Sequence, residues 1–350
     1  MKAELLGLDA VEWASFLRAN GHDFYHLPAY VALCAAQENG TPCALHVADG
    51  TRRMLLPLII RPIPGGAFDA TSPYGYPGPL VNGASDQTFF QSALIAGAST
   101  LRSRRIVSAF VRLHPLFNAS FPDGFGTLVQ HGDTVSVDLS LPADELWAQT
   151  RQNHRRDITR ALALGYVARM DEGLAHYDAF KDLYGRTMER RSAAPFYHFD
   201  DRYWNGLRDA LGRRMHLCVV ERDGQIAAAG LFVETRGLVQ YHLSGTIDGS
   251  SRVQPTKLMI QFVRSWAKER GDLWLHLGGG VGAESDSLMR FKLGFSTIRH
   301  PFRTLRIVLD EPEYRRLVSE HSPFLDPDAR DGFFPLYRSD VTRTGSDVRG

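Results

Sequence analysis

One order of secondary-structure elements is predicted twice along this chain, and that repeat constrains the fold more than any other feature of the sequence. The first copy begins with a helical pattern over residues 9–20. It continues as two strands that meet at the turn Asp49–Gly50, the second of which runs over 53–61. A helix over 87–102 and a strand over 106–113 complete this copy.

The second copy begins with a helix over residues 177–190. A three-stranded meander follows, with strands over 215–221, 225–234 and 238–244. Pro255 suits the first turn of the next helix, which closes at Gly271, and a last strand covers 273–277. The repeat therefore predicts an α+β chain of two tandem domains, each with a mixed, mainly antiparallel sheet flanked by helices.

Composition agrees with two domains and restricts the classes of function. The 350 residues are 44% hydrophobic, which is enough to fill two sizeable cores. No segment approaches the ~20 consecutive apolar residues of a membrane span, so we expect a soluble, cytoplasmic and monomeric protein. The three cysteines have no metal-ligand spacing, and we expect neither a disulfide, nor a metal, nor a cofactor. The net charge of +1 excludes a broad nucleic-acid surface, so any contact with RNA must be local.

A long amphipathic helix over residues 145–164 is predicted between the two copies, with Trp147, Ile158 and Leu162 on its apolar side. We place the boundary near Pro142. The first domain then covers 1–141, and the second covers 142–303. A strand over 305–309 and a Pro-rich segment are expected to return to the first domain, which 304–338 completes. The polar residues 339–350 are predicted to be a disordered tail.

Several short motifs, in this order and spacing, resemble one known family. They are Ser72-Pro73-Tyr74-Gly75-Tyr76-Pro77-Gly78-Pro79, Thr187-Met188-Glu189-Arg190, Tyr241-His242-Leu243-Ser244-Gly245, Leu277-Gly278-Gly279-Gly280 and Phe291-Lys292-Leu293-Gly294-Phe295. Over roughly residues 24–303 the chain is similar to the Fem family and its BioF2-like relatives. The resemblance implies two GNAT-type N-acyltransferase domains and transfer of an aminoacyl group from tRNA to an amine.

The acceptor that this resemblance implies stays open between a peptidoglycan precursor and a peptide natural-product intermediate. It would be a small peptide or peptidyl-nucleotide, either free or bound to a carrier protein. The chain departs from the peptidoglycan enzymes because only a short stretch lies between Arg191 and Tyr203, where several of them insert a helical arm. The segment 26–34 also lacks the lysine of the members that bind nucleotide sugars.

Lys292 is the catalytic residue that the resemblance implies. The aminoacyl ester is already activated, so the protein must align a neutral amine with the carbonyl and stabilise the oxyanion. A compact ammonium can do this, and the chain has only five lysines among 40 basic residues. The alternative is an ordinary lysine at a helix C-terminus whose ammonium reaches solvent. On either view, replacing Lys292 is expected to change stability little.

The acceptor-binding residues are also assigned by resemblance. Aromatic rings could stack on or hydrogen-bond to a substrate, and a helix end that carries arginines could bind its carboxylate or phosphate. The assigned residues are Tyr74, Tyr76, Thr187, Arg190, Arg191, Tyr197 and Tyr241. The alternatives are buried structural tyrosines and simple capping of the helix.

A tRNA surface is predicted on the linking helix, where arginines lie opposite the apolar stripe. They are Arg151, Arg155, Arg156 and Arg160, and the alternative is a solvated charged face. Gly279 and Gly280, in the loop 278–282 before a helix that opens near Ser285, could let the backbone approach a phosphate. Lys257 is assigned to the same surface.

Two other functions remain open at this point. An acyl-CoA-dependent N-acyltransferase would use the same fold, but its pyrophosphate needs a glycine-rich turn before the helix at Pro255. Residues 250–257 contain no glycine, and Pro255 lacks an N–H donor. The second alternative is a non-catalytic binding module, which a dispensable Lys292 would favour.

Overall fold

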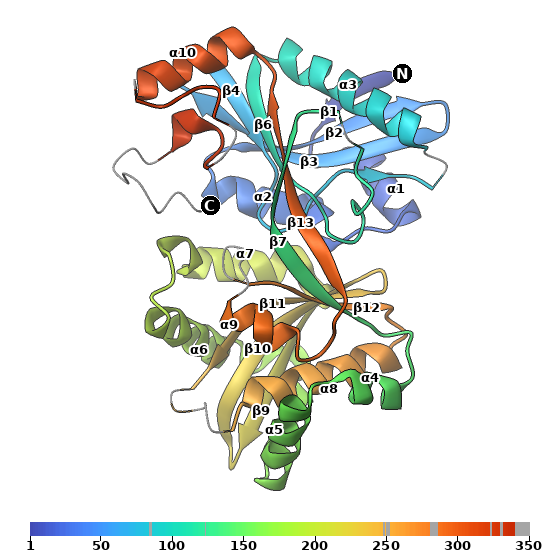
Figure 1. Ribbon diagram of the computed structural model, residues 1–350, viewed down its shortest axis with the longest axis vertical. Coiled ribbons are helices and arrows are strands. Elements are labelled where there is room, and N and C mark those ends of the chain that lie inside the picture. The colour runs from blue at the N-terminus through green and yellow to red at the C-terminus, as the bar shows by residue number, and fades with distance from the viewer. Residues whose placement is uncertain are drawn as a thin grey trace. The chain divides into compact units, whose positions relative to one another are not determined.

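The chain forms two compact units (Figure 1). The computed structural model describes residues 1–83, 86–122, 124–247, 249, 253–280, 286–322, 324–329 and 332–339. Unit 1 comprises Met1–Gly132 and Pro301–Gly350, and unit 2 comprises Asp133–His300. Three predicted features lie wholly or largely outside the described residues: the loop 281–282 with the helix start near Ser285, the turn 250–252, and the tail beyond 339.

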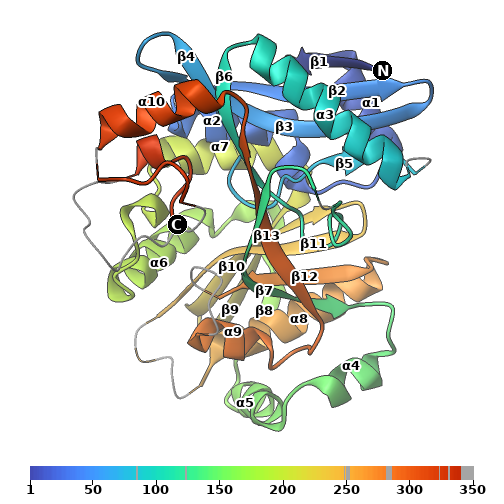
Figure 2. The same ribbon diagram turned by 45° about the horizontal axis from the view of Figure 1, so that its top comes forward.

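Unit 1 is built on a mixed sheet with the order β1-β2-β3-β4-β6-β13, and the short β5 pairs with β3. The strands are β1 (Lys2–Leu6), β2 (Thr41–Asp49), β3 (Arg52–Ile63), β4 (Ala67–Thr71), β5 (Leu80–Val81), β6 (Ile106–Arg112) and β13 (Arg299–Val308). The helices are α1 (Val11–Ala19), α2 (Pro28–Gln37), α3 (Gln87–Ser103) and α10 (Glu311–His321). Helix α3 lies across the sheet (Figure 2), where its buried Phe89, Ala93 and Leu94 join the core.

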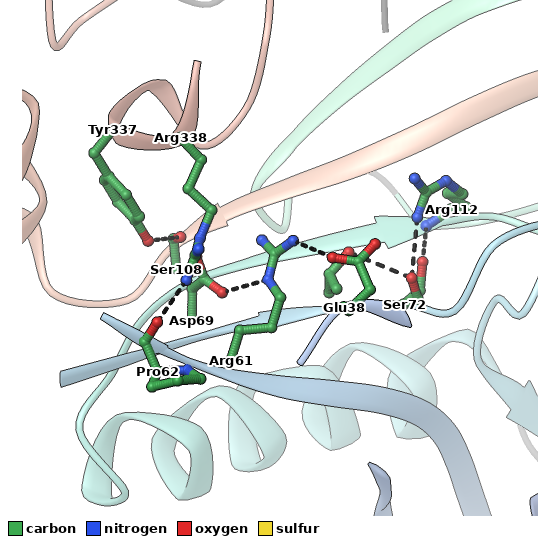
Figure 3. A network of polar contacts seen from close by, with 10 residues as sticks. Glu38, Arg61, Pro62, Asp69, Ser72, Ser108, Arg112, Tyr337 and Arg338 are labelled. Atoms are coloured by element: carbon green, nitrogen blue, oxygen red, sulfur yellow. Dashed lines mark hydrogen bonds and ion pairs between the residues drawn. The ribbon is translucent and has the colours of Figure 1, made fainter. Parts of the chain in front are cut away.

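A buried carboxylate attaches the closing segment to unit 1. Asp69 on β4 is fully buried and accepts one hydrogen bond from Arg61 Nε at 2.8 Å and another from Arg338 Nε (Figure 3). The neighbouring Tyr337 and Ser108 share a hydrogen bond at 2.7 Å. Two cations compensate one buried charge, so the last turn of the chain becomes part of the domain.

Unit 2 has the strand order β7-β12-β11-β10-β9-β8. The strands are β7 (Thr127–Asp138), β8 (Val167–Met170), β9 (Met215–Arg222), β10 (Gln225–Thr235), β11 (Leu238–Thr246) and β12 (Trp274–Gly279). The helices are α4 (Ala143–Gln149), α5 (Gln152–Ala163), α6 (Tyr177–Arg190), α7 (Asp201–Leu211), α8 (Pro255–Glu269) and α9 (Ser287–Lys292). The α+β fold with mainly antiparallel sheets is confirmed.

Helices α6 and α8 cover opposite faces of this sheet (Figures 1 and 2). Ala228 and Phe232 of β10 share a core with residues of α8. Gly245 of β11 pairs with Ala229 and faces the other way, where an added Cβ would come within 2.7 Å of the backbone of Leu183 on α6. Because successive side chains along a strand point to opposite faces of the sheet, one face packs against α8 and the other against α6.

The sheet opens between β11 and β12. These two strands are parallel, and their pairing covers only Leu238–Gln240 with Trp274–His276. Beyond these residues β12 pairs on its other side with β7, through Gly278 with Val135 and Gly279 with Thr134. The second half of β11 stays paired with β10. A split between two central strands therefore begins at Tyr241 and Leu277.

The predicted long helix over 145–164 is wrong, because the chain turns at Thr150 and Arg151 and forms α4 and α5. The buried Arg264 of α8 stabilises this break by donating to Leu146 O and Thr150 Oγ1, both at 2.9 Å. These bonds satisfy groups that would otherwise pair within a continuous helix. Leu162, predicted on the apolar side, is 55% exposed.

The described residues contain no helix that is both long enough and apolar enough to cross a membrane.

Asp272, between α8 and β12, is a buried carboxylate with an unsatisfied oxygen. Its side chain is 6% exposed, and Oδ2 has no hydrogen-bond partner within the described ranges. Burial, with a smaller contribution from the charge of Glu234, raises the pKa of Asp272 to about 6. The protonated carboxyl therefore contributes stability that is complete below the unfolded-state pKa of about 3.9 and is lost as the pH rises through 6.

We predict that Asp272→Asn stabilises the protein at pH 8 by about 1–3 kcal/mol and has little effect at pH 4, because the amide is never charged. Thermal unfolding at the two pH values measures this. Asp209→Asn, an exposed change of the same charge, should shift neither melting temperature. An equal effect of Asp272→Asn at both pH values would contradict the assignment.

Candidate active site

The split between β11 and β12 brings together two residues that the sequence assigned to the site. Lys292 ends α9, which Asp286 caps by accepting from Met289 N at 2.8 Å. The side chain reaches back to the end of β12, where Nζ donates to Gly279 O at 2.6 Å. The same Nζ lies 5.9 Å from the centre of the Tyr241 ring on β11. The two strand ends and α9 thus hold an amine beside an aromatic face.

Lys292 is buried, with 7% of its surface exposed, so its ammonium does not reach solvent. Burial lowers the pKa of Lys292 from 10.5 to about 7, against the opposing charge of Asp286. Near neutral pH the amine therefore exchanges readily between its charged and neutral forms. An ammonium has three N–H donors and Gly279 O takes one, which leaves capacity for a substrate oxygen.

Tyr241 has the geometry of a positioned ring. It stacks on Phe232 with the ring centres 5.3 Å apart, and its hydroxyl shares a short hydrogen bond with Ser244 Oγ. Burial raises the pKa of Tyr241 to about 12, although the Ser244 hydrogen bond and the Arg191 charge act in the opposite direction. The phenol therefore remains a neutral hydrogen-bonding group in the physiological range, and Arg191 lies close enough to influence it.

The C-terminus of α6 is attached to the end of β11. Thr187 Oγ1 donates to Leu183 O at 2.7 Å and accepts from Thr246 N at 3.0 Å. Arg190 Nη2 donates to Thr246 O at 3.0 Å. Thr187 and Arg190 therefore use these side-chain groups to hold the end of β11. Arg191, by contrast, is exposed at the end of α6.

Tyr197 lies elsewhere in unit 2, beside an open pocket of about 210 Å³ that α6 and the segment before α7 line. Tyr74 and Tyr76 belong to unit 1. Tyr74 O accepts from Tyr30 Oη at 3.2 Å, and the Tyr76 ring packs edge-on against Tyr25 and Phe302, with ring centres 5.6 and 5.3 Å away. Both side chains are only half-buried, and their assignment to the acceptor stays a prediction.

The four arginines of the predicted tRNA surface all belong to α5, with Arg151 at its N-cap. Arg151, Arg156 and Arg160 are exposed. The Arg155 guanidinium instead donates to Ala148 O at 2.7 Å and caps the end of α4. Lys257 is buried, and its Nζ donates to Asp157 Oδ2 at 2.6 Å, so this lysine joins α8 to α5 rather than offering a surface charge. Gly279 contributes its carbonyl to Lys292, and Gly280 is half-buried beyond it.

Sequence reasoning missed Ser244, which orients the Tyr241 hydroxyl, and Tyr184, which lines the pocket. Ser244 was part of a quoted motif, and its position three residues after Tyr241 in a strand gave no reason to expect a contact. Among the described residues, no group of three or more metal-ligating side chains is close enough to hold a metal ion.

Comparisons with known proteins identify the fold of this chain. Residues 148–292 match the family described as "Acetyltransferase (GNAT) domain". No curated protein matches the chain by sequence. Among solved structures, FemX superimposes with a TM-score of 0.68 at 13% identity, over 90% of this chain and 99% of that one.

Two further solved structures match the chain with lower TM-scores. The C-terminal domain (DUF2156) of a putative lysylphosphatidylglycerol synthetase from Agrobacterium fabrum matches at 14% identity and a TM-score of 0.54, over 84% of this chain and 90% of that one. L-PGS from Bacillus licheniformis matches at 14% identity and a TM-score of 0.54, over 85% and 92%. The chain therefore has the fold of tandem GNAT-type acyltransferase domains, matches the GNAT domain family over residues 148–292, and resembles the Fem family.

Proposed function

We propose that this chain is an aminoacyltransferase that moves an aminoacyl group from tRNA to an amine at the split between β11 and β12. The buried amine of Lys292, 2.6 Å from Gly279 O and 5.9 Å from the Tyr241 ring centre, carries the proposal. The resemblance to the Fem family, whose members perform this reaction, supports it.

The reaction needs one well-placed cation. The acceptor nitrogen bonds to the carbonyl carbon of the aminoacyl ester, and the electron pair moves to the carbonyl oxygen. When that pair returns, the bond to the ribose oxygen breaks, and the proton lost by the amine goes to the departing ribose. The charged form of Lys292 is shielded from water, so it stabilises the intermediate oxyanion more strongly than an exposed ammonium would. The open edge of β11 offers backbone groups to an extended substrate.

The N-terminus of α8 argues against a CoA pyrophosphate at this site. Pro255 starts the helix without an N–H donor, and Lys257 N is already bonded to Gln254 O at 2.9 Å. Both features remove amides that would otherwise bind an anion at a helix N-terminus. An acyl-CoA-dependent N-acyltransferase remains the second candidate, because the matched family is an acetyltransferase family.

The exposed arginines suggest where each substrate lies. Arg191, close to Tyr241, is suited to a carboxylate or phosphate of the acceptor, which we propose to be a cell-wall precursor or a natural-product peptide. Arg156 and Arg160 on α5 are suited to phosphates at the tRNA acceptor end. The ion pair of Lys257 with Asp157 removes Lys257 from this surface.

We predict that Lys292→Met lowers the rate of aminoacyl transfer by ~10²–10³, the usual loss for one oxyanion donor. The same change should raise the melting temperature, since it removes a buried cation. Because the folded-state pKa of Lys292 is lowered to about 7, the gain should be larger at pH 6 than at pH 9. Single-turnover transfer from labelled aminoacyl-tRNA and thermal unfolding measure the two effects.

Two further variants act as controls for Lys292→Met. Lys292→Arg should rescue only part of the rate, because a planar guanidinium cannot place its charge at the same point. Lys268→Met removes a half-buried lysine that donates to Leu139 O, and it should leave transfer unchanged. Near-wild-type transfer by Lys292→Met would leave Lys292 as an ordinary helix-terminal charge and the catalytic assignment without a residue.

We predict that acetyl-CoA binds weakly and does not serve as a donor. Calorimetric titration with CoA and an assay of acetyl transfer to primary amines test this. Micromolar affinity together with turnover of acetyl-CoA would replace the tRNA-dependent reaction by the second candidate.

The double variant Arg156→Gln/Arg160→Gln should weaken tRNA binding and reduce its salt dependence by about one unit of slope for each phosphate that the protein no longer binds. Binding measured across a series of salt concentrations gives the slope. Arg202→Gln/Arg208→Gln, which removes two exposed arginines of α7, is the matched control. If both pairs change the slope equally, the α5 arginines are only a solvated face.

A further inference from the structure

The backbone on both sides of Lys292 is held by the start of α5. His154 Nε2 lies 2.9 Å from Phe291 O, and because a carbonyl can only accept, the imidazole donates through Nε2. The backbone N–H of Arg151 donates to Gly294 O, also at 2.9 Å. The carbonyl of Phe291 belongs to the peptide group that contains the nitrogen of Lys292. The bond from His154 therefore acts directly on the backbone of the lysine.

The imidazole of His154 packs closely against the turn that ends α9. The side chain is 4% exposed and meets the Phe295 ring edge-on, with the ring centres 4.9 Å apart. A Cβ added to Gly294 would lie 2.1 Å from His154 Nε2, far inside van der Waals contact. Glycine at this position therefore allows the imidazole to reach the carbonyl of Phe291.

His154 is neutral in the physiological pH range. Burial, and to a smaller extent the charge of Lys257, lower the pKa of His154 to about 4. The neutral ring has one N–H, and the bond to Phe291 O uses it. His154 therefore holds the end of α9 without adding a second positive charge near the Lys292 amine.

The start of α5 is itself fixed to α8. Lys257 of α8 donates to Asp157 Oδ2 at 2.6 Å. Arg264 of the same helix donates to Thr150 Oγ1 at 2.9 Å, and Ile158 is buried in the core that α5 shares with α8. Within unit 2, a continuous series of contacts therefore runs from α8 through α5 to the end of α9.

A buried lysine needs such support because its side chain is long enough to leave the site. Among the residues that the structure describes, Lys292 Nζ donates to Gly279 O, and the centre of the Tyr241 ring is 5.9 Å away. Desolvation of an ammonium with so few partners is unfavourable, and a lysine stem normally carries its charge to water. The position of the amine therefore depends on how firmly the backbone of α9 is held.

We propose that His154 is a positioning residue for Lys292, because its hydrogen bond to Phe291 O keeps the Lys292 amine directed at the end of β12. His154 acts through the lysine and takes no part in making or breaking bonds. This proposal deepens the proposed function, and it rests on that function only for its effect on aminoacyl transfer. The effect on the place of the amine is independent of the reaction.

Two substitutions of similar size separate the donated hydrogen bond from packing. His154→Leu removes the N–H and keeps most of the volume, whereas His154→Gln retains an amide N–H that can reach Phe291 O. The pKa of Lys292 is measured in each protein by NMR with ¹³C-labelled lysine. In His154→Leu the amine should gain water, and its pKa should rise by at least about one unit, a tenfold change in its protonation equilibrium. His154→Gln should restore most of the difference.

Single-turnover aminoacyl transfer gives a second measurement. We expect His154→Leu to lower the maximal rate about tenfold to a hundredfold, the scale of a misplaced catalytic group. The concentration of aminoacyl-tRNA that gives half of this rate should change little, and His154→Gln should recover most of the rate. If the wild-type chain transfers nothing from tRNA, the proposed function fails, and the NMR titration still decides whether His154 positions Lys292.

Gly294→Ala tests the same contact from its other side. The new methyl group would displace the imidazole, so the pKa of Lys292 should rise as it does in His154→Leu. In His154→Ala/Gly294→Ala the methyl group has room, and this double variant should have nearly the same Lys292 pKa as His154→Ala alone.

Leu207→Ala is the control for a general loss of stability. It truncates a buried residue of α7 rather than one of the core that α8 and α9 share. This substitution should lower the melting temperature and leave the pKa of Lys292 unchanged.

Two outcomes would overturn the proposal. One is an unchanged pKa of Lys292 in both His154→Leu and Gly294→Ala, which would leave His154 with a role in packing alone. The other is an equal rise of this pKa in His154→Leu, His154→Gln and Leu207→Ala, which would reflect general loosening of unit 2. If His154→Leu does not fold, Gly294→Ala decides by the same measurement.

Discussion

The short pairing of β11 with β12 is the constraint on which the chemistry of unit 2 depends. Parallel strands in a sheet normally continue side by side, and their backbone groups satisfy one another. Here the pairing ends after Leu238–Gln240, and each strand must find other partners. β12 stays paired with β7 on its other edge, Gly279 O accepts a hydrogen bond from the Lys292 amine, and Thr187 and Arg190 hold the end of β11.

The split between the strands leaves space in which a lysine side chain can be buried. An amine inside a protein loses hydration, and the lowered pKa of Lys292 shows that few compensating charges surround it. One carbonyl and one aromatic face are weak partners for a full charge. The fold therefore carries a destabilising group at the position where a reaction would need it, as expected of a functional site.

Local signals in the sequence predicted much of the fold. The turn Asp49–Gly50 and the proline at 255 marked the first hairpin and the start of α8, because turn and cap chemistry act within a few residues. The break between α4 and α5 could not be predicted in this way, since Arg264, more than a hundred residues away, stabilises it. Helix α10 had a usable signal in Asp310, which caps Glu313 N, but the neighbouring prolines suggested a loop.

The sequence likewise predicted only part of the candidate site. The position of Lys292 followed from a motif, but its burial depends on Gly279 and Tyr241, which come from two separate strands. The hydroxyl of Tyr184, which has no partner among the residues that the structure describes, had no sequence signature, because a helical tyrosine gives no indication of its partners. The Lys257–Asp157 pair joins two helices and was hidden for the same reason.

The central claim is that a desolvated amine with a lowered pKa lies at the split between β11 and β12. NMR titration tests this claim directly. The chain has five lysines, so ¹³C labelling of lysine gives a spectrum in which each Cε signal can be assigned by substitution. The account predicts that Lys292 titrates near pH 7. Titration of Lys292 near pH 10.5, like an ordinary exposed lysine, would contradict it.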